Sequence, residues 1–333
     1  MQSARLGLVG AIRAIRAIRA IVALGALGLG PAALGACYRD RAPAGPLANA
    51  EPAADARAAA ENDPLAFLPL ESDVVIGLDA RQILGSGLWR YLEPRLMQRF
   101  GGGLAELRQA CGYDLLAALR SVTVGVRLGS STEGVIVLRG LPRDRTTACL
   151  ARGVAGRGPA RIEGGVITVP GASPDEPPAS MAFAGAATLV LGSTRAALAA
   201  ALSAGAPLRR SPAFFELWSR VDARRAAWLV ANGNSSVFDR LSALGVRPRA
   251  LLGSISLASG LALTGRLRLG SPDEAAQLSS LAQAQSGALQ GMAGRLEIGA
   301  EGSDVTVQVE LSEAQLETLA GLALGVWSSR TGP

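Results

Sequence analysis

The hydrophobic pattern from residue 65 onward predicts short strands alternating with helices. The stretch DVVIGLDA at 73–80 is an apolar, β-branched run typical of a strand, and helix-compatible sequence follows it. Two helices are expected next, at 85–100 and 104–120, separated by the three glycines at 101–103. The stretches SVTVGVRLG and EGVIVLRG then predict a hairpin with turn residues at 129–132.

The remaining pattern predicts the same succession of elements twice. The first succession ends with a helix, two single strands and a helix, expected at 143–153, 160–171, 180–192 and 193–205. The second comprises elements expected at 211–221, 225–233, 235–245, 251–270, 271–289, 294–300, 303–311 and 312–327. Side chains that cap helices mark three of its helix starts: Ser211 before Pro212, Ser271 with Glu274, and Ser312 with Gln315.

Local sequences also match between the two successions. SVTVGVRL at 121 is similar to SISLASGL at 254, VLRGLPRD at 137 to RLRLGSPDE at 266, and ARIE at 160 to GRLE at 294. These offsets lie between about 129 and 134 residues, which is typical of an internal duplication. Chance similarity between two alternating strand-helix patterns is the alternative.

We therefore expect an α+β protein with two tandem copies of a β-α-β-β-α-β(-β-α) unit. The order suggests ferredoxin-like layers of mostly antiparallel sheet with helices on one face. The rival arrangement is helix-grip-like, with one long helix clasped by a curved sheet. The expected organisation is a signal peptide at 1–36, a lipidated cysteine with a flexible tether at 37–64, and repeats at 65–206 and 207–330.

The N-terminal 36 residues differ in composition from the rest. They contain Arg5, Arg13, Arg16 and Arg19 and no acidic residue, and an apolar run of about 17 residues follows at 20–36. A charged segment, an apolar segment and small residues in this order are typical of a secretory signal. The apolar run is rich in glycine and interrupted by Pro31, which makes it marginal for crossing a bilayer.

The end of this run, Leu34-Gly35-Ala36-Cys37, resembles the lipobox of bacterial lipoprotein precursors. That resemblance implies cleavage between Ala36 and Cys37, acylation of Cys37, and attachment to a membrane of the cell envelope. Tyr38 follows the cysteine in place of the aspartate that favours inner-membrane retention, so the outer membrane facing the periplasm is expected. An ordinary signal cleaved near Ala36 and an uncleaved anchor are the alternatives. The rest of the chain resembles no family that we can name.

Charge outside this segment is nearly balanced. Lysine and histidine are absent, so all 33 basic residues are arginines, and removing residues 1–36 leaves 29 arginines against 27 acids, a net charge of about +2. No basic stripe with interleaved aromatics occurs, which argues against nucleic-acid binding. Residues 38–63 are rich in alanine, proline and charge without apolar periodicity, as in linkers.

Two cysteines remain if Cys37 carries lipid. Cys111 and Cys149 both lie in predicted helices that flank the 121–140 hairpin. Secreted proteins favour disulfides, so these two residues are the candidate pair. Two buried free thiols, which behave as small hydrophobic groups, are the alternative.

The sequence contains little that indicates catalysis. Without histidine, Ser-His-Asp and Cys-His arrangements are impossible, and no P-loop, C-x-x-C or G-x-S-x-G motif occurs. Glu163 and Glu297 occupy matching positions in the ARIE and GRLE stretches, so a two-carboxylate site on a pseudo-twofold axis is conceivable. A surface residue inherited twice is the simpler explanation. We expect neither a cofactor nor a metal.

The expected function is accordingly a non-catalytic, lipid-anchored envelope protein with a binding or assembly role. Its partners would be the membrane, through the anchor, and an envelope protein or an apolar ligand. A carrier with an apolar cleft between the repeats is the alternative, and a hydrolase that works without histidine is a minor one.

Overall fold

The computed structural model describes residues 63–128, 132–153, 158–171, 178–203, 207–233, 238, 245–287 and 293–330. The predicted signal peptide, Cys37 and nearly all of the predicted tether lie outside these residues, as does most of the helix predicted at 235–245.

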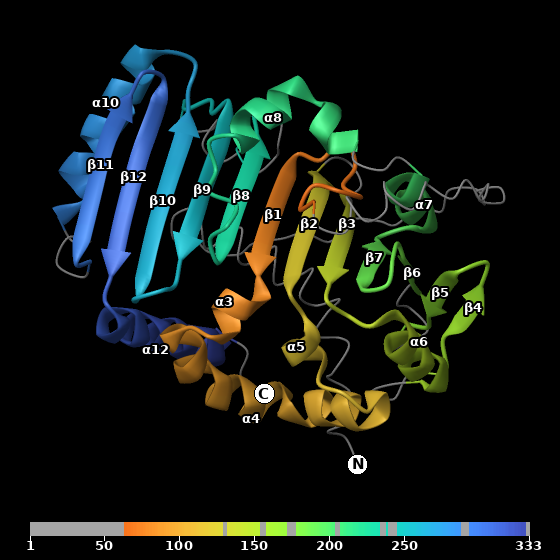
Figure 1. Ribbon diagram of the computed structural model, residues 1–333. Coiled ribbons are helices and arrows are strands. Elements are labelled where there is room, and N and C mark those ends of the chain that lie inside the picture. Colours follow the sequence, from red (N-terminus) through yellow and green to blue (C-terminus); the bar gives the residue numbers. More distant parts are fainter. Residues whose placement is uncertain are drawn as a thin grey trace.

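The described strands form one 12-stranded antiparallel sheet (Figure 1). Its order is β11-β12-β10-β9-β8-β1-β2-β3-β7-β6-β5-β4. The strands are β1 (Val74–Asp79), β2 (Ser121–Leu128), β3 (Thr132–Arg139), β4 (Arg161–Glu163), β5 (Val166–Val169), β6 (Ala179–Phe183), β7 (Thr188–Gly192), β8 (Ala227–Asn232), β9 (Ala250–Ser256), β10 (Leu261–Arg268), β11 (Arg295–Glu301) and β12 (Asp304–Leu311). The protein therefore has mixed helices and strands around a large antiparallel sheet, as the pattern predicts at this level.

The two halves of the chain meet in the middle of this sheet, where β1 pairs with β8. Outward from this pair, the first half runs β1-β2-β3-β7-β6 and the second runs β8-β9-β10-β12-β11. The hairpin of β4 and β5 extends the first half alone.

Cross-strand pairs of the two halves can be aligned when each strand is given its own shift in residue number. A constant is added to the residue numbers of each strand in the first half, chosen separately for each strand, to give its counterpart in the second half. The cross-strand pair Val74–Val126 then corresponds to the pair Ala227–Ile255. Two further cross-strand pairs behave in the same way: Ser121–Arg139 falls on Ala250–Arg268, and Arg139–Thr188 falls on Arg268–Asp304. In the central pair Ile76 faces Leu229, and these two residues are each other's counterparts.

Helices cover both faces of the sheet. They are α3 (Ala80–Leu84), α4 (Gly87–Cys111), α5 (Leu115–Ala118), α6 (Arg143–Arg152), α7 (Arg195–Ser203), the 3-10 turn η1 (Pro207–Arg210), α8 (Pro212–Trp218), α10 (Pro272–Gln285) and α12 (Glu313–Arg330). Leu198 of α7 packs with Val190, whereas Leu150 of α6 packs with Leu189. Because successive strand residues point to opposite faces, α7 and α6 lie on opposite sides.

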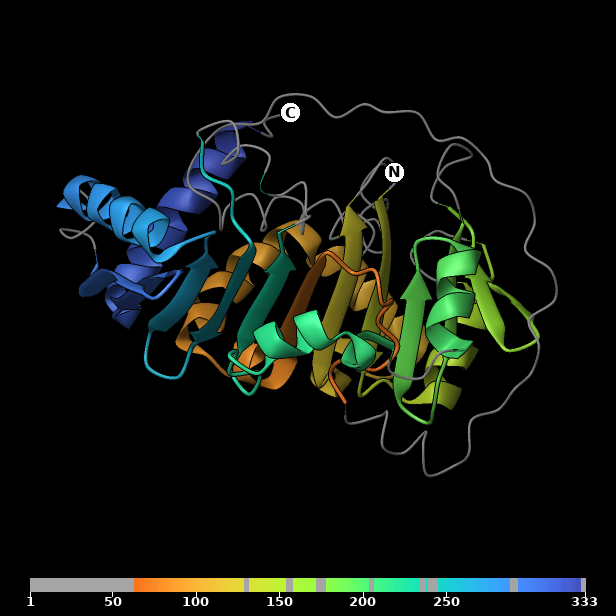
Figure 2. The same cartoon turned by 90° about the horizontal axis from the view of Figure 1, so that it is seen from above.

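We call the side that carries Val190 face A and the side that carries Leu189 face B. Phe214 of α8 shares the face A core with Val230, and Ala275 of α10 packs on face B with Val305. Figure 2 shows α7 and α8 in front of the sheet and α4 behind it. The expectation that all helices share one face is therefore wrong.

The strand order also differs from the ferredoxin-like one. That fold contains a split β-α-β unit, in which a helix connects parallel strands. Here β1, β2, β3 and β7 lie side by side and all of their pairings are antiparallel. The helix-grip alternative is not observed either, because the extensive contacts of α4 among the described residues are with α3, α6 and α12.

Two local predictions need correction at glycines. Helix α4 continues through residues 101–103, where two helices were expected, and it ends at Gly112 in the left-handed conformation. The stretches at 160–171 and 180–192 each form a hairpin rather than a single strand. In the first hairpin Gly164 and Gly165 have φ values of 55° and 77°, as a two-residue turn requires.

The described part of the chain starts at Asp63, the last residue of the stretch predicted as a linker at 38–63. Leu65, Ala66 and Leu68 have no exposed surface and join the face A core. The backbone oxygen of Asp63 accepts a hydrogen bond from the guanidinium of Arg139, which is itself only 7% exposed. Burial lowers the pKa of Arg139 to about 10, although Asp63 acts in the opposite direction. The chain thus enters the core within a few residues of the linker.

Candidate functional site

The candidate lipidation site, Cys37, lies outside the described residues, and so does its neighbour Ala36. Among the helices that are described, none has the length and apolar composition needed to cross a bilayer.

The other two cysteines are joined by a disulfide in the structure. Cys111 ends α4 and Cys149 lies in α6, with their Cα atoms 4.6 Å apart, which is within the usual range for a bridge. Both are buried on face B, in a cluster with Leu141 and Ile167. The bridge ties α4 to α6.

We predict that non-reducing digestion yields one peptide pair that links Cys111 to Cys149 and is lighter by two hydrogens than the reduced pair. Reduction should lower the thermal midpoint, because the cross-link restricts the unfolded chain. Mass spectrometry and thermal unfolding check this. The double variant Cys111→Ser/Cys149→Ser is the control and should not respond to reductant. Free thiols in oxidised, folded protein would contradict the bridge.

The suggested pair of carboxylates does not assemble. Glu163 lies on β4 and Glu297 on β11, which are the two opposite edges of the sheet. In the strand order, β11 of the second half takes the place that β6 takes in the first half. The similar sequences ARIE and GRLE lie on β4 and β11, which are therefore not equivalent strands. Glu163 is paired with Arg161 and Glu297 with Arg295, each on its own strand. A two-carboxylate site at these residues is therefore wrong.

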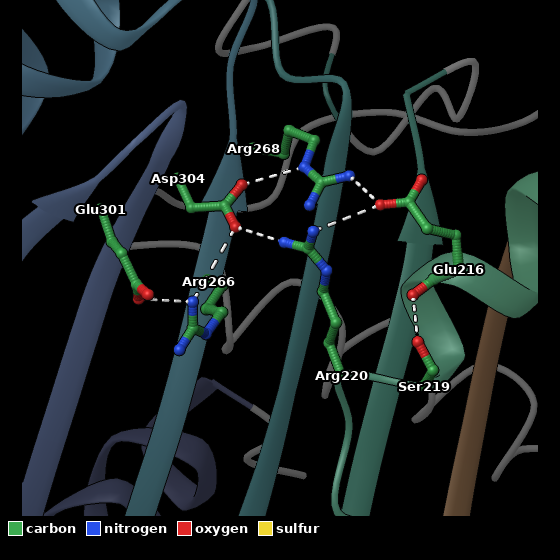
Figure 3. A network of polar contacts seen from close by, with 7 residues as sticks. All are labelled: Glu216, Ser219, Arg220, Arg266, Arg268, Glu301 and Asp304. Carbon is green, nitrogen blue, oxygen red and sulfur yellow. Dashed lines mark hydrogen bonds and ion pairs between the residues drawn. The ribbon is translucent and has the colours of Figure 1, made fainter.

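The structure instead reveals a charged network on face A, which the sequence did not indicate (Figure 3). Its centre is Asp304, whose side chain is 5% exposed. Its Oδ1 accepts from Arg268 Nε at 2.9 Å and its Oδ2 from Arg220 at 3.0 Å. Glu216 of α8 binds the same two guanidinium groups, at 2.8 Å and 3.4 Å.

The network ties α8 to the strands below it. Arg266 extends it toward β11, with Glu301 at 2.7 Å and Asp304 at 3.9 Å. The charges balance within the network (Figure 3), whose ion pairs join three arginines to three carboxylates: Arg220, Arg266 and Arg268 to Glu216, Glu301 and Asp304. The hydrogen bonds that Arg268 donates to Asp304 and Glu216 raise its pKa, so it stays protonated. We interpret the network as a structural clamp.

The clamp also predicts a response to acid. The hydrogen bond and charge of Arg268 lower the pKa of Glu216 below its ordinary value of 4.5. The group therefore stabilises the fold fully above the unfolded pKa of 4.5, and its contribution disappears as pH falls through the lower folded value. Denaturant titrations from pH 7 to pH 3 should show a smaller acid loss in Glu216→Gln than in wild type. Since Glu216 is half exposed, the difference should be modest, and identical pH profiles would contradict this role.

A cleft of about 660 Å³ lies beside the clamp. It is bounded by α8, by the residues before β1 and by the ends of β8, β9 and β10, and its lining includes Leu70, Phe214, Glu216, Arg247, Arg249 and Arg268. Leu70 is 50% exposed, so the cleft presents apolar surface as well as charge. Its size falls within the range of small-molecule sites.

The polar groups of the cleft show no arrangement for nucleophilic catalysis among the described residues. The Ser72 hydroxyl donates to the backbone oxygen of Pro69, and Ser211 Oγ accepts from the backbone N–H of Phe214 as a helix cap. Glu274 accepts from the backbone N–H of Gly270 at 3.0 Å. No described group of three or more Cys, Asp or Glu residues could hold a metal ion.

Comparison with known proteins gives no assignment, since no family model, curated protein or solved structure matches the chain.

Proposed function

We propose that the protein is a non-catalytic lipoprotein that Cys37 anchors in the cell envelope, with a binding or assembly role on the periplasmic side of the outer membrane. One arrangement carries this proposal. The charged and apolar segments end at Leu34-Gly35-Ala36-Cys37, and a linker of about 26 residues separates that cysteine from Asp63, where core packing begins. Such a linker would reach at most about 90 Å when fully extended. It would hold the sheet clear of the bilayer.

The anchor is tested on protein isolated from membranes of the native or a related host. Mass spectrometry should find a mature chain that begins at an acylated Cys37. The variant Cys37→Ala cannot be acylated at this position and should lose its lipid-mediated attachment to the membrane. The variant Cys111→Ser/Cys149→Ser is the matched control, because it removes cysteines without touching the anchor. An unacylated N-terminus, or unchanged attachment of Cys37→Ala, would overturn the proposal.

The proposed role is binding because the cleft offers a ligand surface, whereas the described residues offer no nucleophile with a base. Crosslinking in the intact envelope, followed by identification of the linked proteins, tests whether there is a protein partner. The alternative of an apolar-ligand carrier is less well supported, since three arginines and two glutamates line the cleft. A hydrolase that works without histidine would need two carboxylates, or a serine with another base, close together, and Glu163 and Glu297 do not provide such a pair.

We further infer that the fold consists of two tandem copies of one unit, near 65–206 and 207–330. The matching strand order on the two sides of the β1–β8 pair supports this, because β1-β2-β3-β7-β6 and β8-β9-β10-β12-β11 place successive elements of the two halves in the same order. The copies differ at the clamp, where Asp304 corresponds to Thr188. Arg139 donates to Thr123 Oγ1 at 3.3 Å and to the Asp63 backbone. The first copy thus buries its arginine beneath the N-terminal segment.

A further inference from the structure

Arg247 and Arg249 differ from the other charged groups of the cleft. Both are exposed and line it, and neither forms an ion pair with any described residue. The carboxylates beside them are engaged, because Glu216 binds Arg268 and Arg220, and Glu274 accepts from the Gly270 backbone. Outside the clamp, Arg247 and Arg249 face a single carboxylate in the lining, that of Glu274, so this part of the cleft carries an excess of positive charge.

The segment that carries these arginines is held in place. Pro248 between them is buried, and a residue that precedes proline is restricted to extended conformations. The Arg249 backbone N–H donates to the Arg268 oxygen at 2.7 Å. The segment also packs on Gly233, where an added Cβ would lie 2.6 Å from the Arg249 oxygen. A fixed backbone at this position limits the part of the conformational entropy that the segment would lose on binding an anion.

Apolar surface completes the site. Leu70, Leu208, Ala213 and Leu217 line the same cleft, with Leu70 half exposed. Arginine forks match carboxylate and phosphate oxygens, while an apolar wall favours a ligand with a hydrocarbon portion. A purely apolar ligand would leave Arg247 and Arg249 desolvated without a partner.

We propose that this cleft binds a small organic anion, with a carboxylate or phosphate on Arg247 and Arg249 and an apolar portion against Leu70. The proposal rests on the binding role given above and names the ligand class for it. The clamp of Glu216, Arg268 and Asp304 would hold the floor of the cleft in shape. Because the charges within the clamp balance, recognition would fall to Arg247 and Arg249, which have no ion-pair partner among the described residues.

The test uses the full chain as its host matures it, in zwitterionic nanodiscs if it is acylated and in buffer if it is not, with empty nanodiscs or buffer as the blank. Calorimetry measures 4-phenylbutyrate and phenyl phosphate as anionic probes and 4-phenylbutanol as the neutral one. We expect both anions, or one of them, to bind and the alcohol to bind at least ten-fold more weakly. Comparing the two anions tells whether the site prefers carboxylate or phosphate.

The decisive variant is Arg247→Gln/Arg249→Gln, which should weaken anion binding at least ten-fold. The matched control Arg161→Gln/Arg224→Gln removes two exposed arginines outside the cleft and should bind as wild type does. Absent anion binding in wild type, equal affinity for the alcohol, or an unaffected double variant would each overturn the site. Acylation at Cys37 and envelope crosslinks are measured separately, so the broader function can stand or fall independently.

Discussion

Gly77→Ala is expected to lower the free energy of unfolding by about 3 kcal/mol, the upper end of the usual cost of overpacking a core. Gly77 lies directly opposite Trp228 in the β1–β8 pair that joins the halves of the sheet. A Cβ at Gly77 would lie 2.0 Å from Trp228 Cε2, so the indole would have to move. It has little room to do so, since Trp228 is 5% exposed and its ring lies edge-on to Trp218 with centroids 4.5 Å apart. Chemical denaturation and tryptophan emission would measure the loss and the displaced ring.

The matched control is Gly265→Ala in β10. A Cβ there meets nothing closer than Leu263 Cδ2 at 3.7 Å, so the change should be neutral or slightly stabilising. A double-mutant cycle isolates the contact, because Gly77→Ala should cost little once Trp228→Ala has removed the ring. If the two losses add, the indole is not the cause and the interpretation of this pair fails.

Sequence patterns predicted elements well where a local rule governs them. Ser211 and Ser271 cap α8 and α10, with hydrogen bonds to Phe214 and Glu274 backbone N–H groups, as their spacing implied. The hairpin of β2 and β3 pairs as expected. These features depend on residues close together in the chain, so the sequence contains the information needed to recognise them.

Long-range features were predicted less well. The pattern of β1, β2, β3 and β7 fits either a ferredoxin-like order or the observed antiparallel order, because strand periodicity does not specify the neighbour. The Gly164-Gly165 pair is typical of a two-residue hairpin turn, so the prediction of a single strand at 160–171 was wrong for a local reason. Helix α4 overrides the cost of its central glycines, an effect that local propensity cannot reveal.

The charged clamp, like the strand order, depends on residues that are far apart in the chain, so local patterns did not predict it. The clamp brings together Glu216, Arg268 and Asp304 from α8, β10 and β12, which are far apart in the chain. One signal was nevertheless present, since Arg139 and Arg268 are each the third residue of the matched stretches that begin at 137 and 266. The match of Glu163 with Glu297 was misleading. The short similar sequences ARIE and GRLE lie on β4 and β11, and these two strands do not occupy equivalent positions in the strand order of the two halves.

Asp304→Asn is expected to destabilise the protein by about 3 kcal/mol, the low end for breaking a buried ion pair. The asparagine keeps the shape of the side chain but removes the charge that Arg268 and Arg220 share. Both guanidinium groups would then depend on Glu216, and the group would carry one uncompensated positive charge. Denaturant unfolding measures the loss.

The variant Glu301→Gln tests whether the loss of stability in Asp304→Asn comes from the burial of the carboxylate or only from the change in net charge. It removes one carboxylate from the same network, yet Glu301 is 68% exposed, whereas Asp304 is 5% exposed. Water screens the exposed pair with Arg266, so this variant should change stability by no more than about 0.5 kcal/mol. A similar cost for the two variants would mean that net charge alone matters. A much larger loss of stability in Asp304→Asn than in Glu301→Gln would show that the buried ion pairs of Asp304, which link α8 to the sheet beside the cleft, stabilise the fold.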